Sequence, residues 1–410
     1  MIIKSSPPLS KNSSVLFATF SVWNNNQRLP TNGSVEPLRD FLVPRVRKLV
    51  IIDQLYPGSE DVIPKIEEYT GSMKFIPRKS SWVVYLLKPI LAMSHSNGTQ
   101  IRFKIRDFLS VIDWSFRDKI HFDYLIGLES VNALAGIFLR KIGRVKKVVY
   151  YVSDYSPKRY PQKWFNAVYL WLDRFCAMHA DYIWDVSKAM QPARIKAGLN
   201  PQKSAPVIHV PNGLYKNQIK ANPVSKIDRH SMVYMGTLGP ENGPDVAIQA
   251  LALVRERFPD ANLHIIGGTD KDFVWLKKII QKLHLEKSVY HHGFVQKSSD
   301  MSKIISLCSV GLAPYRAIPG SPRYYADAGK IRVYAAAGIP IVSSQVPPLG
   351  LEVSKKGAAL IVNDDSKSFA EAIINIFTDT KLYLKLRKNA IIFAKDSTWE
   401  NSFLNAFRHM

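Results

Sequence analysis

The sequence is poor in cysteine. Only two of the 410 residues are Cys, and these, Cys176 and Cys308, lie far apart in the chain. They provide neither a disulfide framework nor the spacing of a metal site, so we expect a protein of a reducing compartment, without a metal or another cofactor. The N-terminus lacks the pattern of a secretory signal peptide, which favours the cytoplasm.

Long hydrophobic runs are also lacking. The longest, residues 82–93, contains Lys88 and Pro89 and is too short to span a bilayer. Low-complexity tracts and internal repeats are absent as well. With 46% hydrophobic and 22% charged residues, the composition is that of a globular protein, and the length predicts two or three domains.

Acidic residues are few compared with basic ones. The chain carries 56 Lys and Arg against 33 Asp and Glu, a net charge of +23, and residues 1–215 hold 30 against 16, a net charge of +14. The densest basic stretches are residues 102–119, 140–147 and 158–163. This balance predicts an anionic partner, either nucleic acid or an anionic lipid surface. For any single cluster, a solvated basic surface is the ordinary alternative.

Short apolar strands alternate with amphipathic helices, most regularly over residues 231–392. This alternation predicts an α/β fold of right-handed βαβ units. Residues 1–214 repeat it less regularly and residues 215–230 are polar, so we expect an N-terminal domain, a linker and a C-terminal domain. Residues 393–410 are expected to form a terminal helix that packs back on the N-terminal domain. Two such domains imply a ligand cleft at the carboxyl ends of their strands.

A helix is predicted from Trp164 to about residue 183. Its apolar residues at 164, 168, 171, 172 and 175 recur at helical spacing. We interpret this spacing as core packing, with an aromatic membrane face as the less favoured alternative.

Residues 324–344, YYADAGKIRVYAAAGIPIVSS, predict a helix with an unusual start. Asp327 is the expected N-cap, Gly338 the residue after the C-cap, and Pro340 blocks continuation. Lys330 lies in the first turn, where the helix dipole favours acidic side chains. A cation at that end indicates an anionic ligand, although an ordinary surface Lys remains the alternative.

Six segments together resemble the glycosyltransferases of the GT-B class, most closely family four and its membrane-associated relatives. They are VIHVPNGLY, VYMGTLGPENGPDVAIQALALV, LHIIGG, HHGFV, GLAPY and GKIRVYAAAGIPIVSS. The resemblance covers most of residues 205–380 and is thin over residues 1–200. It implies two facing Rossmann-like domains, each with a doubly wound, mostly parallel sheet. The second would bind a nucleoside-diphosphate sugar and the first the acceptor, without a metal.

Carried onto this sequence, the resemblance implies a set of donor-binding residues in the second domain. They are Gly236, Thr237, Gly293, Phe294, Tyr315, Ser321, Gly329, Lys330, Val333, Tyr334 and Glu352. For most of them a turn, a core position or a helix start is the competing interpretation.

The sequence departs from family four at four of its usual charged positions. Tyr325 and Val333 stand where two Glu are usual, and Thr237 and Asn242 stand where an Arg and a Lys neutralise the phosphates. Lys330 would then supply more of the positive charge, with Arg323 or Arg316.

A Lys three residues before a missing Glu is similar to the inverting glucuronosyltransferases of exopolysaccharide assembly. In that group the Lys binds the diphosphate and an Asp of the first domain is the general base. The corresponding residue here is Asp154, for which capping the next segment, or starting the turn at Ser156-Pro157, is an equally good interpretation. Glu129 is a second acidic candidate, and Asn32 and Gly33 would form an acceptor-side loop or only a turn. Retention or inversion stays open.

The leading hypothesis is a hexosyl- or glycosyltransferase for cell-surface glycan or exopolysaccharide synthesis. It would use a UDP- or GDP-sugar donor and a polyprenyl-diphosphate-linked or other anionic glycan acceptor, peripherally on the inner face of the plasma membrane. A sugar-nucleotide epimerase or hydrolase of similar fold is the first alternative. A non-catalytic protein that binds nucleic acid or membranes is the second, but no nucleic-acid-binding motif is present, so no nucleic acid is expected.

Overall fold

The computed structural model describes residues 9–24, 27–28, 33–56, 59, 62–71, 73–75, 86, 98–117 and 121–410. Asn32 and, apart from Leu86, the apolar run 82–93 lie outside these residues. The chain forms two compact units, one of Met1–Pro211 with Ser402–Met410 and one of Asn212–Asn401. We call them the N-terminal and the C-terminal unit. The boundary at Pro211 lies three residues before the predicted end of the first domain.

The N-terminal unit is built on an eight-stranded sheet of order β10-β9-β8-β7-β1-β4-β5-β6. The strands from β10 to β4 run parallel, and β5 and β6 add antiparallel pairs at one edge, so the sheet is mostly parallel. The strands are β1 Ser14–Ser21, β4 Lys48–Leu55, β5 Lys65–Thr70, β6 Met73–Phe75, β7 Phe122–Leu128, β8 Val145–Val152, β9 Tyr182–Asp185 and β10 Val207–His209, with a separate ribbon of β2 Trp23–Asn24 and β3 Gln27–Arg28.

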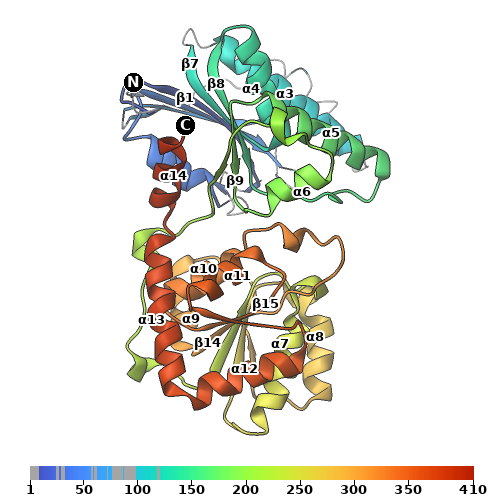
Figure 1. Ribbon diagram of the computed structural model, residues 1–410, viewed down its shortest axis with the longest axis vertical. Helices are drawn as coiled ribbons and strands as arrows, with labels where there is room; N and C mark the ends of the chain where they lie inside the picture. Colours follow the sequence, from blue (N-terminus) through green and yellow to red (C-terminus); the bar gives the residue numbers. More distant parts are fainter. Residues whose placement is uncertain are drawn as a thin grey trace. The chain divides into compact units, whose positions relative to one another are not determined.

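Helices cover both faces of this sheet because its side chains alternate in direction. Leu125 of β7 packs against α4, where an added Cβ at Gly136 would lie 2.6 Å from its side chain. The adjacent Tyr124 meets Phe407 of α14 on the opposite face. The helices are α1 Val35–Leu42, α3 Gly98–Arg117, α4 Glu129–Lys141, α5 Lys163–His179, α6 Met190–Lys196, the 3-10 turn η1 Pro201–Lys203 and, for the most part, α14 Trp399–Arg408. α3, α4 and α5 lie side by side (Figure 1).

The helix predicted from Trp164 ends earlier than expected. Ala180 leaves the helical conformation, and residues Tyr182–Asp185 form strand β9 between β8 and β10. The prediction ran too far because Tyr182, Ile183 and Trp184 continue the apolar pattern, which suits a buried strand as well as a helix.

The C-terminal unit contains a six-stranded parallel sheet of order β13-β12-β11-β14-β15-β16. Its strands are β11 Ser231–Met235, β12 Asn262–Ile266, β13 Val289–His291, β14 Val310–Ala313, β15 Ile341–Ser344 and β16 Ala359–Val362. Its α-helices are α7 Pro244–Arg255, α8 Asp270–Lys282, α9 Ser298–Leu307, α10 Gly329–Ala336, α11 Pro348–Lys355, α12 Ser366–Thr378 and α13 Thr380–Asp396, with the 3-10 turns η4 Pro240–Asn242 and η5 Pro322–Tyr324.

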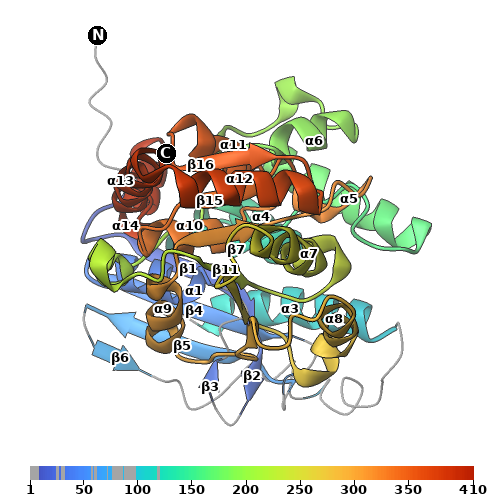
Figure 2. The ribbon, with the colours of Figure 1, turned by 90° about the horizontal axis from the view of Figure 1, so that it is seen from below.

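Two apolar cores enclose this second sheet. One joins it to α12, α7 and α8, which lie in that order along that face in Figure 2, and the other joins it to α9, α10 and α11. Side chains of α13 enter both cores. The strands and helices predicted over residues 231–392 are therefore confirmed, and the fold is α/β with mostly parallel sheets.

Residues 215–230, predicted as a linker, pack on the C-terminal unit. They contain the 3-10 turns η2 Lys216–Gln218 and η3 Val224–Lys226. The backbone N–H of Lys220 donates to the carbonyl of Ala336 at 3.0 Å, and that of Asp228 donates to Leu307 at 2.9 Å. Backbone pairing of this kind carries no hydrophobic period, so the sequence pattern did not reveal it.

The predicted N-cap of α10 is wrong. The helix begins at Gly329 with Ala328 as N-cap and without a side-chain cap. Asp327 instead accepts a hydrogen bond from the N–H of Asn212 at 2.8 Å and forms a buried ion pair with Arg332 at 3.0 Å. The predicted end is confirmed, because Gly338 follows the C-cap with φ of +65°.

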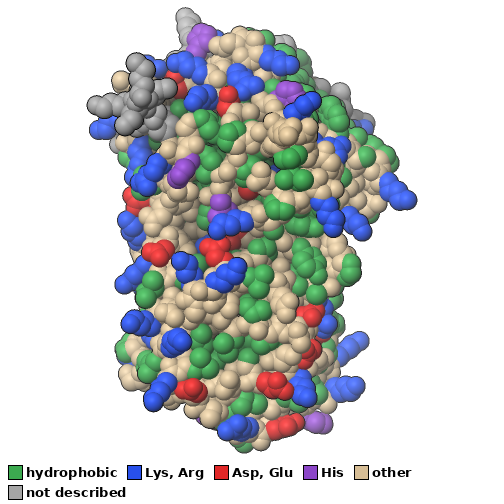
Figure 3. Space-filling view, viewed as in Figure 1, with side chains coloured by type: hydrophobic (Ala, Val, Ile, Leu, Met, Phe, Trp, Pro, Cys, Tyr) green, Lys and Arg blue, Asp and Glu red, His purple; other side chains and the backbone are tan. Residues whose placement is uncertain are grey.

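Figure 3 shows many Lys and Arg side chains on the surface and fewer Asp and Glu, as the net charge requires. Among the described residues, no helix has both the length and the apolar character needed to cross a bilayer.

Candidate functional site

Glycines end three neighbouring strands of the C-terminal sheet. Gly236 follows β11, Gly267 and Gly268 follow β12, and Gly293 lies two residues after β13. The N–H of Gly236 donates to Ile266 at 2.9 Å, and that of Gly267 donates to Gly293 at 2.8 Å. An added Cβ at Gly267 would lie 2.2 Å from the carbonyl oxygen of Gly236, so the close approach requires glycine. We call these four residues the glycine edge.

Lys330 extends from the first turn of α10 to this glycine edge. Its side chain is buried, and an added Cβ at Gly236 would lie 3.2 Å from its Nζ. Nζ lies 4.1 Å from the ring centroid of Tyr234 and 4.5 Å from that of Tyr315. No described group forms a hydrogen bond with this Nζ. A buried lysine amine beside two ring faces, without a hydrogen-bond partner among the described residues, is suited to an anionic ligand.

The electrostatics of Lys330 agree with this geometry. Burial lowers its pKa well below the usual value, and the positive charge of Arg323 lowers it further. The Arg323 guanidinium lies 5.9 Å from the ring centroid of Tyr315, and its buried Nε has no partner among the described residues. Two cations therefore gather near the start of α10, whose dipole adds to the positive potential.

Several other predicted donor-binding residues surround this point. Gly329 is the first residue of α10, with open space at its Cα, and Phe294, next to Gly293, is 65% exposed. The Ser321 hydroxyl accepts a hydrogen bond from the N–H of Arg323 at 3.2 Å, so it supports the loop that carries this cation. Burial raises the pKa of Tyr315 to about 12, so its hydroxyl stays protonated.

Thr237 and Asn242, which replace the usual cations, bond to each other. Asn242 donates from Nδ2 to the Thr237 hydroxyl at 2.8 Å, and the Tyr234 hydroxyl donates to the Thr237 carbonyl at 2.6 Å. Arg316 forms an ion pair with Asp245, so its charge is compensated within the protein. Of the two arginines proposed to assist Lys330, the structure brings Arg323 near it.

Two predicted donor residues have other surroundings, and a third has a different place in its helix than one alternative required. Tyr334 is fully buried; its hydroxyl accepts from the N–H of Met235 at 2.8 Å and donates to Leu312 at 3.1 Å, so it packs the sheet and lines no accessible surface. Val333 lines a small pocket with Met301 of α9. Glu352 is the fifth residue of α11, so the alternative of a helix-starting Glu is wrong.

Sequence reasoning assigned no role to Gly267, Gly268 or Tyr234, although all three contribute to this region. The paired glycines after the strand in LHIIGG were a usable signal, because a strand that ends in two glycines often allows close backbone approach. Nothing in the sequence pattern indicated that the Tyr234 ring faces Lys330, since the contact spans 96 positions of the chain (330 − 234).

In the N-terminal unit, Glu129 directly follows β7 as the first residue of α4, in a conformation that is rare for a residue other than glycine. Its φ is +65°, and its buried carboxylate accepts hydrogen bonds from the N–H of Ser153 at 3.2 Å and from its hydroxyl at 2.9 Å. Burial raises the pKa of Glu129, Arg159 opposes this shift, and the negative charge of Asp154 adds to it. Backbone strain at a buried carboxylate is typical of functional sites.

Asp154 lies close by, after β8, but its side chain is 52% exposed. It pairs with Arg159 at 3.1 Å, and Arg159 also donates to the Asp154 carbonyl at 2.7 Å. The N-cap of α5 is Gln162, so Asp154 does not cap that helix. Gly33, the described member of the predicted acceptor loop, lies in a turn before α1 with open space at its Cα.

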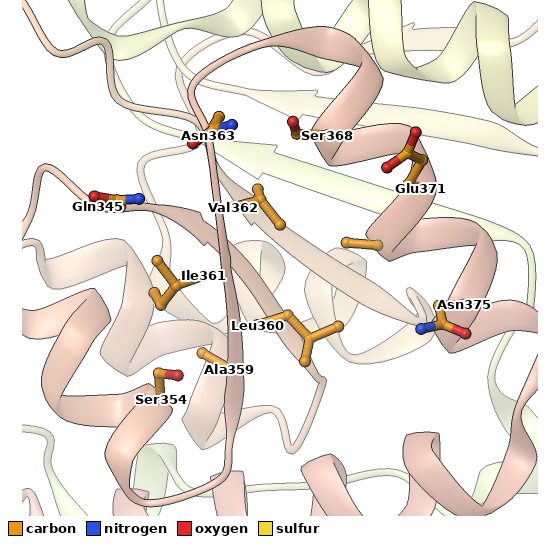
Figure 4. A pocket seen from close by; sticks show the side chains of 11 residues that line it. Gln345, Ser354, Ala359, Leu360, Ile361, Val362, Asn363, Ser368, Glu371 and Asn375 are labelled. Atoms are coloured by element: carbon orange, nitrogen blue, oxygen red, sulfur yellow. The ribbon is translucent and has the colours of Figure 1, made fainter.

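A pocket of about 570 Å³ lies at the edge strand β16 (Figure 4). Its walls include Gln345, Asn363 and Glu371 but no cation and none of the predicted site residues. It is therefore not the anion site around Lys330.

Comparison with solved structures identifies the fold class of the protein. The solved structure of sucrose-phosphate synthase from Thermosynechococcus elongatus superimposes with a TM-score of 0.69 at 15% identity, covering 96% of this chain and 97% of that one. Anabaena Alr3699/HepE, solved with UDP, gives 0.66 at 17% identity, covering 97% and 100%; it was also solved with UDP-glucose. The fold is that of the GT-B glycosyltransferases.

The sequence comparisons are more specific. Residues 216–393 match the family Glycosyl transferases group 1, so this segment is a domain of that family. A D-inositol 3-phosphate glycosyltransferase from Jonesia denitrificans is 28% identical over 176 residues, which are 42% of this chain and 40% of that protein. The matched region thus spans well under half the length of the curated relatives.

Proposed function

We propose that the protein is a glycosyltransferase that moves a sugar from a nucleoside-diphosphate donor to a lipid-linked or polysaccharide acceptor. The observation that carries the proposal is the buried Nζ of Lys330, which lies at the start of α10 beside Gly236 without a hydrogen-bond partner among the described residues. The group 1 domain over residues 216–393 and the UDP and UDP-glucose complexes of a protein with the same fold support a nucleotide-sugar donor.

The cations explain how the leaving group is stabilised. When the acceptor oxygen bonds to the anomeric carbon, the bond from that carbon to the β-phosphate oxygen breaks and its electron pair stays on the diphosphate. Lys330, Arg323 and the start of α10 oppose this developing charge. We propose that these groups act without a metal ion, and that Phe294 contacts the base of the nucleotide.

In an inverting reaction, a general base must take the proton from the hydroxyl group of the sugar acceptor. Asp154 is the candidate by resemblance, but the surroundings of Glu129 suit a general base better. Its carboxylate is buried and accepts a hydrogen bond from Ser153, and burial raises its pKa. We propose Glu129 as the group that binds or deprotonates the acceptor, with Asp154 and Arg159 setting its charge environment.

We further propose that the acceptor is a polyprenyl-diphosphate-linked or other anionic glycan at the inner face of the plasma membrane, in cell-surface glycan or exopolysaccharide synthesis. Support comes from the excess of basic residues in the first half of the chain.

The donor proposal is tested by thermal-shift and calorimetric titration with UDP, GDP and their sugars. Wild type should be stabilised by at least one nucleotide, by about 2.7 kcal/mol at a hundredfold excess over Kd. Lys330→Ala should lose this stabilisation, whereas Lys355→Ala, at an exposed Lys of α11, should keep it. Failure of every nucleotide to stabilise wild type would refute the donor assignment.

Product analysis separates transfer from the alternatives. A transferase releases nucleoside diphosphate only in proportion to the acceptor added, whereas a hydrolase or epimerase converts the donor alone. Activity unchanged by a chelator supports the metal-independent mechanism, and activity lost on chelation and restored by a divalent cation contradicts it.

A further inference from the structure

Helix α5 exposes a stripe of large apolar side chains. Trp164, Val168 and Trp171 are 63%, 50% and 57% exposed, and their spacing of four and three residues places them on one face of the helix. The core-packing interpretation is therefore wrong for these three residues. The opposite face of α5 supplies the buried contacts, through Asp173, Cys176 and Ala177. We call Trp164, Val168 and Trp171 the α5 stripe.

The surroundings of the α5 stripe carry positive charge. The exposed Lys158 and Lys163 lie just before the helix and at its first residue. The only acidic residue of α5, Asp173, is buried, where its carboxylate accepts hydrogen bonds from Arg194 at 3.1 Å and from Tyr150 at 2.7 Å. The stripe thus has no exposed carboxylate on its own helix.

Helix α6 extends this surface. The Arg174 guanidinium of α5 donates to the carbonyl of Ala197, just after α6, at 2.6 Å, which ties the two helices together. On α6, Ile195 is 41% exposed and Lys196 is exposed. Figure 3 shows hydrophobic side chains among Lys and Arg at the right edge of the view, where Figure 1 places α5.

We propose that the α5 stripe docks on an anionic lipid bilayer, with Trp164 and Trp171 in the headgroup region and the neighbouring lysines on lipid phosphates. Tryptophan prefers this interface, and an apolar stripe flanked by cations is the pattern of helices that lie on anionic membranes. The charge decides between the possible occupants, since a second copy of this basic chain would bring like charges together.

The same helix is connected to the acceptor-side carboxylates. The loop from Ser153 to Gln162 joins β8 to α5 and carries Asp154 and Arg159. The Arg159 guanidinium lies 5.5 Å from the ring centroid of Tyr169, and the Tyr160 ring lies 4.4 Å from that of Phe165, both on α5. Docking of α5 would hold this loop at the lipid surface. This extension rests on the proposed function, because it assigns a role to a membrane-embedded acceptor.

The test is vesicle co-sedimentation of the full chain, with phosphatidylcholine alone and with phosphatidylglycerol added. Wild type should bind the anionic vesicles at least about tenfold better and release them in about 0.5 M salt. The variant Trp164→Ser/Trp171→Ser should bind roughly tenfold or more weakly. The matched control, Val274→Ser/Leu384→Ser, changes residues of the C-terminal unit that are 56% and 45% exposed and should bind as wild type does.

A second measurement covers the possibility of misfolding. The stripe variant should retain the thermal stabilisation by nucleotide, since α5 belongs to the other unit. The control variant should retain it as well, because both of its residues are exposed. Quenching of tryptophan emission by brominated lipids should be strong in wild type and reduced in the stripe variant. Equal vesicle binding by wild type and the stripe variant, or no binding by wild type, overturns the proposal. So does a wild-type dimer that the stripe substitutions convert to a monomer. Nucleotide binding with no vesicle binding would refute this surface alone, and the donor proposal would stand.

Discussion

The ammonium of Lys330 lies 4.1 Å from the centroid of the Tyr234 ring. Tyr234 is the residue before the last of β11 and donates its hydroxyl to the carbonyl of Thr237 at 2.6 Å, so the ring is fixed in place. The ring face offers the cation a weak partner in place of water. Lys330 is therefore positioned but poorly solvated, a state that favours capture of an anion and costs stability while the site is empty.

The first prediction concerns that cost. Lys330→Met keeps the length of the side chain and removes the buried amine, so it should raise the unfolding free energy of the nucleotide-free protein by about 1–3 kcal/mol. The same variant should lose nucleotide binding. Chemical denaturation at neutral pH, with and without nucleotide, measures both effects. A variant that is less stable than wild type would show that Lys330 has a structural partner.

The second prediction is a pH dependence. Because the folded-state pKa of Lys330 lies below its unfolded value, the unfolded chain binds more protons between the two, and this residue makes stability rise with pH across that window. A bound diphosphate favours the ammonium, so nucleotide affinity should fall as pH rises above the pKa of the empty site, by up to about tenfold per pH unit.

Calorimetry in two buffers of different ionisation enthalpy measures the expected proton uptake on nucleotide binding. It should be carried out above pH ~7.5, where the phosphates are ionised. Arg323→Met should shift the fall in affinity to higher pH, because it removes a positive charge that lowers the pKa of Lys330. Proton release on binding, or no such shift, would contradict this assignment.

The third prediction tests the close approach at the glycine edge. Gly236→Ala places a methyl group 3.2 Å from Nζ and Cε of Lys330 at a φ of +136°, so it should weaken nucleotide binding by on the order of tenfold and cost about 1–2 kcal/mol of stability. Gly143→Ala is the control, because it also has positive φ but open space around it. It should lose similar stability with unchanged nucleotide affinity. Equal affinities for the two variants would contradict the role of Gly236.

The fourth prediction separates the two acidic candidates. Glu129→Gln should lower kcat by about 10²–10⁴-fold and leave nucleotide binding unchanged, because the amide keeps the hydrogen bond from Ser153 but cannot take a proton. Asp154→Asn should lower kcat by less than about tenfold, since it alters an exposed ion pair.

The pH–rate profile adds an independent readout. With Glu129 as base, activity should rise with pH through its raised pKa, and Asp154→Asn should shift that rise to lower pH by removing a neighbouring negative charge. A larger kcat loss in Asp154→Asn than in Glu129→Gln would return the role to Asp154.

Local patterns predicted much of the fold. The strands of the C-terminal sheet were predictable because each is a short apolar run bounded by polar or glycine residues, and the end of α10 because only glycine readily adopts φ of +65° at Gly338. The start of α10 was not predictable, because Asp327 bonds to Asn212 and Arg332 instead of capping the helix. The partner Asn212 is distant in the chain, so no local pattern shows this contact.

The exposure of one face of α5 was not predicted from the sequence either. A helical period identifies which residues share a face, but whether Trp164 and Trp171 face a core or solvent depends on what packs against that face. In the described structure that face is left to solvent, while Asp173 on the other side is buried with Arg194.

By itself, the sequence determined the alternation of strands and helices, the strand-ending glycines, and a lysine at the first turn of α10. These are local properties, set by backbone preferences and by the spacing of apolar residues. Only the tertiary structure decided that Lys330 is buried against Tyr234 and Tyr315, that Gly236, Gly267 and Gly293 meet at one edge, and that Glu129 is strained and enclosed. The reason is physical, since burial and pKa depend on residues that are distant in the chain and adjacent only after folding.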